Sequence, residues 1–156
     1  RADWLVEKLA ALGVDHLVWL TTQRSVVGLA PDGNKMRRFR RLVDQAARQS
    51  DSNQVMRISP PVRFEQYLEH AFDHRIVADF QGPSITTIGA ESPTSASILI
   101  GPEGGFTESE LCSAIDAGYT PKTLSDSILR VETAAVVAAA LALAPISRAD
   151  PGVFER

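Results

Sequence analysis

The stretch Ile98 to Leu111, ILIGPEGGFTESEL, constrains the fold of this chain more than any other part of the sequence. Its apolar run stops at a turn of glycine, proline and glutamate, residues 101–105, and a helix signature follows. Thr107, followed three residues later by Glu110, predicts a capping box at the start of that helix. Gly118 predicts its end. A buried strand therefore leads through a glycine-rich turn into a helix that begins near residue 108.

Strand-like and helix-like segments alternate along the rest of the chain, and this alternation predicts an α/β domain with a mostly parallel sheet. The apolar periodicity predicts helices over 2–12, 34–49, 64–72, 108–117 and 131–144. Short apolar runs predict strands over 16–21, 55–58, 75–80 and 97–100. The prolines at 60–61 are expected to end the second strand, and the polar residues 89–96 to form a loop.

The glycine-rich turn has two interpretations. Ligands of open α/β sheets bind beyond the carboxyl ends of strands, and glycine lets a ligand approach the backbone closely. Ordinary strand-to-helix turns also contain glycine, so this motif alone leaves both interpretations open. A second segment, residues 124–143, repeats the pattern and places Arg130 and Glu132 at a helix start. That helix is apolar on nearly every face, which predicts burial against a second subunit.

Composition and net charge limit the number of domains and the classes of protein that are expected. The 156 residues suffice for one domain with a core, and the net charge of −3 argues against coating nucleic acid by bulk charge. Cys112 is the only cysteine and the three histidines are scattered, so neither a disulfide nor a metal site is expected. We expect a reducing compartment, the cytoplasm, and no membrane span, because no apolar run reaches about 20 residues. The chain enters a helical pattern at once, so we expect it to be part of a longer protein.

Two motifs together resemble the RsmE-type 16S ribosomal RNA uridine methyltransferases, members of the SPOUT superfamily of S-adenosylmethionine-dependent RNA methyltransferases. The first is Gly-Pro-Glu-Gly-Gly-Phe at 101–106, preceded by Leu-Ile, and the second is Leu124 to Ala134, LSDSILRVETA. Residues 7–26 and 40–50 are also similar to family segments, so the resemblance covers 4–144. The sequence departs from the family where Ser125 and Ser127 replace a glycine and an arginine, and where residues 51–53 lack an expected arginine.

The resemblance implies a mostly parallel sheet with helices on both faces and a C-terminal trefoil knot that holds bent S-adenosylmethionine. It implies a homodimer that methylates N3 of a uridine in 16S ribosomal RNA of the small ribosomal subunit. The methyltransferase domain would span residues 1–145, followed by a tail at 146–156. An N-terminal β-barrel of PUA type, which binds RNA in the family, would precede this chain.

The resemblance also implies functional residues. The cofactor would contact Ile100, Gly101, Gly104, Gly105, Leu124, Ser125, Ile128, Leu129 and Thr133. The candidates for proton transfer and charge stabilisation are Arg130, Glu132 and Glu103, although both carboxylates could also be structural. Independently of the resemblance, the basic helix face at 35–48, together with Arg24, offers candidates for RNA binding, namely Arg24, Arg37, Arg38 and Arg41, although a solvated charged face is the commoner explanation of such a helix. A non-catalytic RNA-binding relative of the SPOUT fold, or a methyltransferase for a different RNA, remains an alternative.

Overall fold

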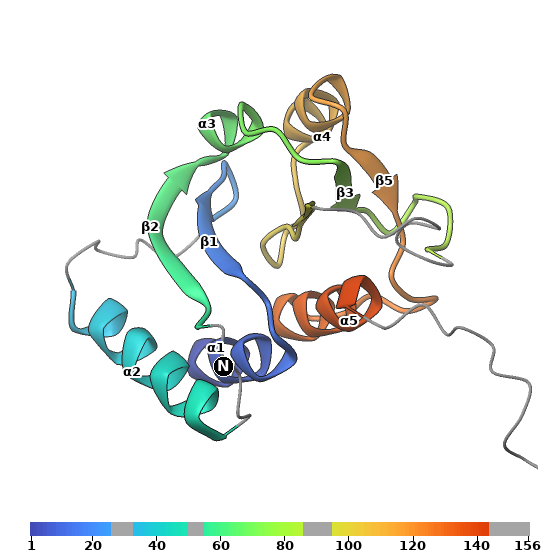
Figure 1. Cartoon of the computed structure of the whole chain (residues 1–156). Helices are drawn as coiled ribbons and strands as arrows, with labels where there is room; N and C mark the ends of the chain where they lie inside the picture. The colour runs from blue at the N-terminus through green and yellow to red at the C-terminus, as the bar shows by residue number, and fades with distance from the viewer. Residues whose placement is uncertain (26–32, 50–54, 86–94, 144–156) are drawn as a thin grey trace, which may run out of the picture.

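The computed structural model describes residues 1–25, 33–49, 55–85 and 95–143, in which helices alternate with strands (Figure 1). The amino-terminal elements are α1 (Ala2–Leu12), β1 (His16–Thr21), α2 (Asn34–Gln49), β2 (Arg57–Arg63) and α3 (Phe64–Leu68). The carboxyl-terminal elements are β3 (His74–Ala78), β4 (Ala96–Leu99), α4 (Glu108–Asp116), β5 (Thr120–Lys122) and α5 (Val131–Leu143). Among these, no helix is both long and apolar enough to cross a membrane.

All strand pairs in the described residues are parallel, which confirms the expected α/β class. The strands form two sheets instead of one, with β1 paired to β2 and the others in the order β4-β3-β5. Because parallel strands of one sheet point the same way, the carboxyl ends of β3, β4 and β5 share an edge. The segments that follow these three strands therefore start side by side.

Two hydrophobic clusters form the core, and β1 contributes to both. Leu17 and Trp19 pack with α1, α2 and α5, and the Trp19 ring stacks on Phe39 with centroids 5.4 Å apart. Leu20, which points to the other face of the strand, packs with α3, α4, β3 and β4. Helices accordingly cover both faces, with α1 and α2 at one end of the molecule and α3 and α4 at the other (Figure 1).

The predicted end of the second strand was wrong. Strand β2 continues through the two prolines that were expected to end it. Val18 pairs with Ser59 and Leu20 with Val62, so Pro60 and Pro61 together oppose a single residue of β1. This is a β-bulge. Prolines lack an N–H to donate, and they are tolerated here because β2 pairs with β1 alone among the described strands.

One helix is shorter than predicted, and one strand was missed. Helix α3 ends at Leu68 rather than at residue 72, and its residues 64–68 make a single short turn of helix. The short strand β5 was not predicted as such, because its sequence Thr-Pro-Lys has no apolar run. Most of the predicted loop 89–96 and the whole predicted tail 146–156 lie outside the described residues.

Candidate active site

The segments after β3 and β5 are joined by backbone hydrogen bonds at the shared sheet edge. Asp79 N donates to Lys122 O at 2.9 Å, and Thr123 N donates to Pro83 O at 3.0 Å. Gly82 lies so close to β5 that a Cβ there would come within 2.8 Å of Lys122 N. Because β4 pairs with β3 on the other side, both motifs of the sequence analysis follow strands of this one edge.

The first motif forms a compact turn that we call the glycine loop, residues 101–106. Gly105 N donates to Pro102 O at 2.8 Å, which closes the turn. Gly105 has φ +68° and nothing within 4 Å of where a Cβ would stand, so its outer face is open. Gly101 is tightly packed instead, since a Cβ there would lie 3.1 Å from Phe106 N. The loop thus combines a backbone that requires glycine with an open surface.

The predicted capping box is present, and its carboxylate also reaches a distant segment. Glu110 accepts hydrogen bonds from Thr107 N at 2.8 Å and from Gln23 N at 2.8 Å. Glu110 is 2% exposed. Burial by itself would raise the pKa of this carboxyl, but the hydrogen bonds from the Thr107 and Gln23 backbone hold the pKa below its usual range. The sequence signal for the cap was correct, whereas nothing in it indicated the bond to Gln23.

Arg24 lies against the glycine loop. Its Nη1 donates to the carbonyl oxygen of Gly104 at 2.7 Å and approaches that of Phe106 at 3.4 Å. Its aliphatic stem also packs beside Gly104, where a Cβ would come within 3.3 Å of the Arg24 Cδ. These contacts place Arg24 at the glycine loop, and its expected contact with RNA stays a prediction.

The second motif begins with a hydrogen-bonded turn after β5. Thr123 Oγ1 donates to Ser125 O at 2.9 Å, and Ser127 N donates to Ser125 Oγ at 3.1 Å. Of the two serines that replace family residues, Ser125 thus contributes its hydroxyl to this turn, whereas Ser127 contributes its backbone N–H. Ile128 is 84% exposed, which is unusual for a large apolar side chain. Ala134 N donates to Arg130 O at 2.8 Å, so helix α5 starts directly after the turn.

The three candidate catalytic side chains differ in their surroundings. Glu103 and Arg130 are exposed. Glu132 is half-buried, and its Oε1 lies 3.7 Å from Nε of Arg1. It shares a helical stripe with Ala135 and Ala139, which pack in the cluster that includes α1. Within the described part of the chain, no hydrogen bond or ion pair joins any two of the three candidates.

The arginines of α2 lie on a different part of the molecule from the glycine loop. Arg38 is paired with Asp3 of α1 at 2.9 Å, and Arg37 donates to Asn34 Oδ1 at 2.8 Å. Arg41 is exposed. No group of His, Cys, Asp or Glu suited to holding a metal ion occurs among the residues that the structure describes. Cys112 is exposed on α4.

A parallel α/β domain with a glycine loop at the carboxyl edge of its sheet has the architecture of a cofactor-binding enzyme domain. The family model of the RNA methyltransferase domain matches residues 1–143, and the chain belongs to this family.

Curated relatives carry the same family assignment. The chain is 33% identical over 150 residues to the ribosomal RNA small subunit methyltransferase E of Bacillus subtilis, with 88% of this chain and 59% of that protein covered. It is 32% identical over 143 residues to the methyltransferase of the same name from Synechocystis, with 87% of this chain and 46% of that protein covered. The chain therefore spans about half the length of the curated relatives it matches.

Solved structures agree with the fold. A Legionella pneumophila methyltransferase in complex with SAM, S-adenosylmethionine, matches with a TM-score of 0.82 and 28% identity, covering 90% of this chain and 60% of that one. The ribosomal RNA small subunit methyltransferase E of Neisseria gonorrhoeae, also bound to S-adenosylmethionine, matches with a TM-score of 0.77 and 26% identity, covering 89% and 58%.

Proposed function

We propose that this chain is the catalytic domain of an S-adenosylmethionine-dependent methyltransferase that modifies N3 of a uridine in 16S ribosomal RNA of the small ribosomal subunit, in the cytoplasm. The observation that carries the proposal is the glycine loop, which lies at the carboxyl edge of a parallel sheet in a chain of the RNA methyltransferase family. Two similar solved structures contain S-adenosylmethionine, which supports the choice of cofactor.

The residues at the sheet edge fit this cofactor. The open face of Gly105 would let an adenosine lie against the backbone, and a side chain there would obstruct it. We assign Ile100, Gly101 and Gly104 to the same surface, together with Leu124, Ser125, Ile128, Leu129 and Thr133 from the second motif. The exposure of Ile128 agrees with this assignment, because an apolar side chain facing solvent is available to cover a ligand.

The bound cofactor supplies a methyl group on a positively charged sulfur. Transfer forms a bond between that carbon and uridine N3, breaks the sulfur–carbon bond, and releases the N3 proton to a base. Glu103 is the exposed carboxylate on the glycine loop and is our candidate for that base. Arg130 is the exposed cation at the start of α5 and would stabilise the charge that develops on the uracil. Glu132, directed toward α1 and Arg1, would orient α5.

Three further features form part of the proposal. The C-terminal segments would be threaded through a trefoil knot, as the family resemblance implies. The protein would act as a homodimer in which α5 contributes to the interface. An RNA-binding barrel of PUA type would precede this domain in the complete protein, which accords with relatives that are longer than the chain and of which it covers 46% and 59%.

Calorimetry and methyl transfer test the proposal in sequence. The chain should bind S-adenosylmethionine in a titration, and a non-catalytic RNA-binding relative would show no binding. A transfer assay with tritiated methyl groups should then label 16S ribosomal RNA, with mass spectrometry locating the methyl group on uridine N3. A label on another base or another RNA would show that the enzyme methylates a different target. We expect slow transfer, because much of the RNA affinity would reside in the barrel. As a control, methyl transfer by the segment of the Bacillus subtilis relative that matches this chain is compared with transfer by that relative at full length.

A further inference from the structure

Helix α2 differs sharply in charge from the rest of the chain. It carries six basic side chains and one acidic side chain, Asp44, in a protein whose net charge is −3. Such a concentration of positive charge on one element of an acidic protein is the electrostatic pattern of a surface that binds a polyanion.

Three of these cations already have partners. Lys35 Nζ lies over the Phe39 ring, 5.9 Å from its centroid. Arg38 pairs with Asp3, and Arg37 donates to Asn34. Arg40 is exposed, and within the described residues it has neither an ion pair nor a hydrogen bond. The same holds for Arg57 at the start of β2. These two guanidinium groups are therefore available to a ligand without breaking a contact seen in the structure.

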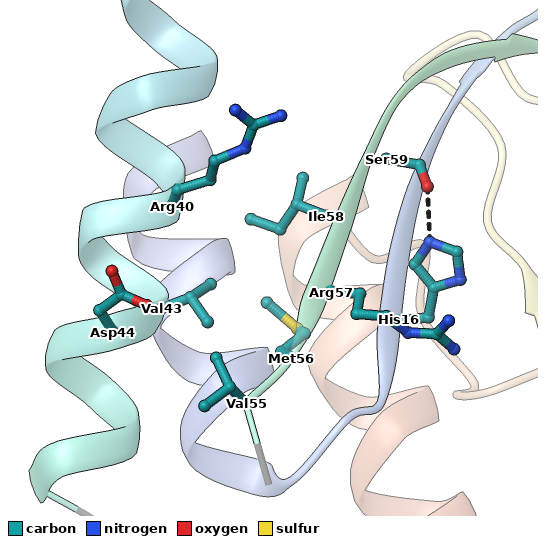
Figure 2. Close-up of a pocket in the computed structure, with 9 residues that line it drawn as sticks. All are labelled: His16, Arg40, Val43, Asp44, Val55, Met56, Arg57, Ile58 and Ser59. Atoms are coloured by element: carbon teal, nitrogen blue, oxygen red, sulfur yellow. Dashed lines mark hydrogen bonds between the residues drawn. The ribbon is translucent and has the colours of Figure 1, made fainter.

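A hollow of about 520 Å³ lies between α2 and the start of β2, within the size range of ligand sites (Figure 2). Arg40 extends from α2 into the space toward β2, and Arg57 stands on the far side of the strand, beside His16 (Figure 2). Val43 and Met56, both buried, form an apolar floor. The hollow thus has an apolar base, with Arg40 on the α2 side and Arg57 on the other face of β2.

His16 and Ser59 complete the polar lining. His16 Nε2 and Ser59 Oγ share a hydrogen bond of 2.6 Å. Burial, together with the nearby charges of Arg57 and His70, lowers the pKa of His16 and disfavours its charged form. The positive charge of the hollow at neutral pH accordingly comes from its two arginines, and Asp44 opposes it.

The hollow is separate from the glycine loop. His16 and Arg57 begin the parallel strands β1 and β2, whereas Arg24, which contacts the glycine loop, follows the end of β1. From His16 to Thr21, β1 spans five residue steps, roughly 17 Å along a strand, and Arg24 follows three residues later. A long flexible polymer can reach both places, whereas a single small cofactor cannot.

We propose that this hollow is a docking site for the sugar-phosphate backbone of the RNA substrate, in which Arg40 and Arg57 each hold one phosphate. The choice of RNA as the polyanion rests on the proposed function. An RNA strand that crosses β2 would bring one phosphate to Arg40 and another to Arg57, on the two sides of the β-strand. Such phosphate contacts set the register of the nucleic acid without reading its sequence.

Fluorescence anisotropy with a short single-stranded RNA provides the test. Arg40→Gln and Arg57→Gln should each weaken binding roughly tenfold at low salt, the effect of one lost charged hydrogen bond. Each should also reduce the slope of log affinity against log salt by about 0.7. Asp44→Asn should strengthen binding. The matched control is Arg63→Gln, which removes an exposed arginine from the other end of β2 and should change little.

The outcomes separate this proposal from the proposed function. S-adenosylmethionine affinity, measured by calorimetry, should be unchanged in all four variants, because the hollow lies away from the glycine loop. Equal losses for Arg57→Gln and Arg63→Gln would overturn the docking site, and so would an absence of RNA binding by the wild type at low salt. Competition by inorganic phosphate as effective as competition by RNA, at equal phosphate concentration, would show a site for free phosphate instead. If the wild type did not bind S-adenosylmethionine, the proposed function would be contradicted and the docking site would not.

Discussion

Arg24 donates a 2.7 Å hydrogen bond to the carbonyl oxygen of Gly104, a residue 80 positions further along the chain. The neighbouring Gln23 N donates to the buried carboxylate of Glu110. Together these contacts attach the segment after β1 to the glycine loop and to the first turn of α4. The glycine loop is therefore positioned by the first half of the domain as well as by its own turn.

Removing the Arg24 side chain should weaken cofactor binding without unfolding the domain. In Arg24→Ala the Gly104 carbonyl loses its donor, so the loop is less well ordered and must be fixed when the ligand binds. We expect about tenfold weaker binding of S-adenosylmethionine by calorimetry. Arg24→Lys, which retains one donor, should recover part of the affinity. A purely RNA-binding Arg24 would leave cofactor affinity unchanged in both variants.

Gly105 should be essential for binding for a reason distinct from backbone strain. Gly105→Ala places a Cβ on the open face of the loop at φ +68°. Gly13, at the end of α1, has φ +85° and equally open surroundings, so Gly13→Ala carries a similar strain away from the site. Both variants should lose about 1 kcal/mol of unfolding free energy. Calorimetry should show loss of S-adenosylmethionine binding only for Gly105→Ala. If Gly105→Ala and Gly13→Ala bound the cofactor equally well, Gly105 would not be part of the cofactor site.

Local signals in the sequence predicted much of the fold. The apolar stripe of α2 has the period of a helix, the short apolar runs of β1 and β4 have the length of strands, and the structure confirms these elements. The capping box at Thr107 was predicted correctly because its two residues are only three positions apart. The strand through Pro60 and Pro61 was missed because tolerance of proline depends on whether a strand has a second neighbour, and that is a property of the sheet.

The candidate site was predictable only in part. The two motifs were expected to follow strands, and the structure places both at the carboxyl edge of one sheet. Contacts between distant segments carry no local pattern, so the roles of Arg24 and Gln23 at the glycine loop were not foreseen. Arg24 was grouped with the arginines of α2 by charge alone, and charge does not determine which surface a residue joins.

Stability at acid pH should depend on Glu110. Its pKa is lowered in the folded protein, so its contribution is fully present above the pKa of the unfolded chain, about 4.3, and is lost as the pH falls through the lower folded value. In Glu110→Gln the amide nitrogen faces backbone N–H groups that need an acceptor, and we expect a loss of roughly 2 kcal/mol at pH 7. Urea unfolding from pH 7 to pH 3 should show the wild type and the variant converging in acid. A constant difference across this range would contradict the assignment.

Helix α5 should form a two-fold interface through the face that its own domain leaves uncovered. Val136, Ala135 and Ala139 pack toward α1, so Val136 contributes to the core of its own chain. Val137 is half-buried and belongs to neither core cluster, so a charge there would oppose a partner subunit without disturbing the core. Sedimentation velocity at micromolar concentration should show a dimer for the wild type and a folded monomer for Val137→Glu, because an isologous contact carries each substitution twice. Ile115→Glu, at an exposed apolar position on α4, is the matched control and should remain dimeric. A monomeric wild type, or a dimer that persists in Val137→Glu, would exclude this face as the interface.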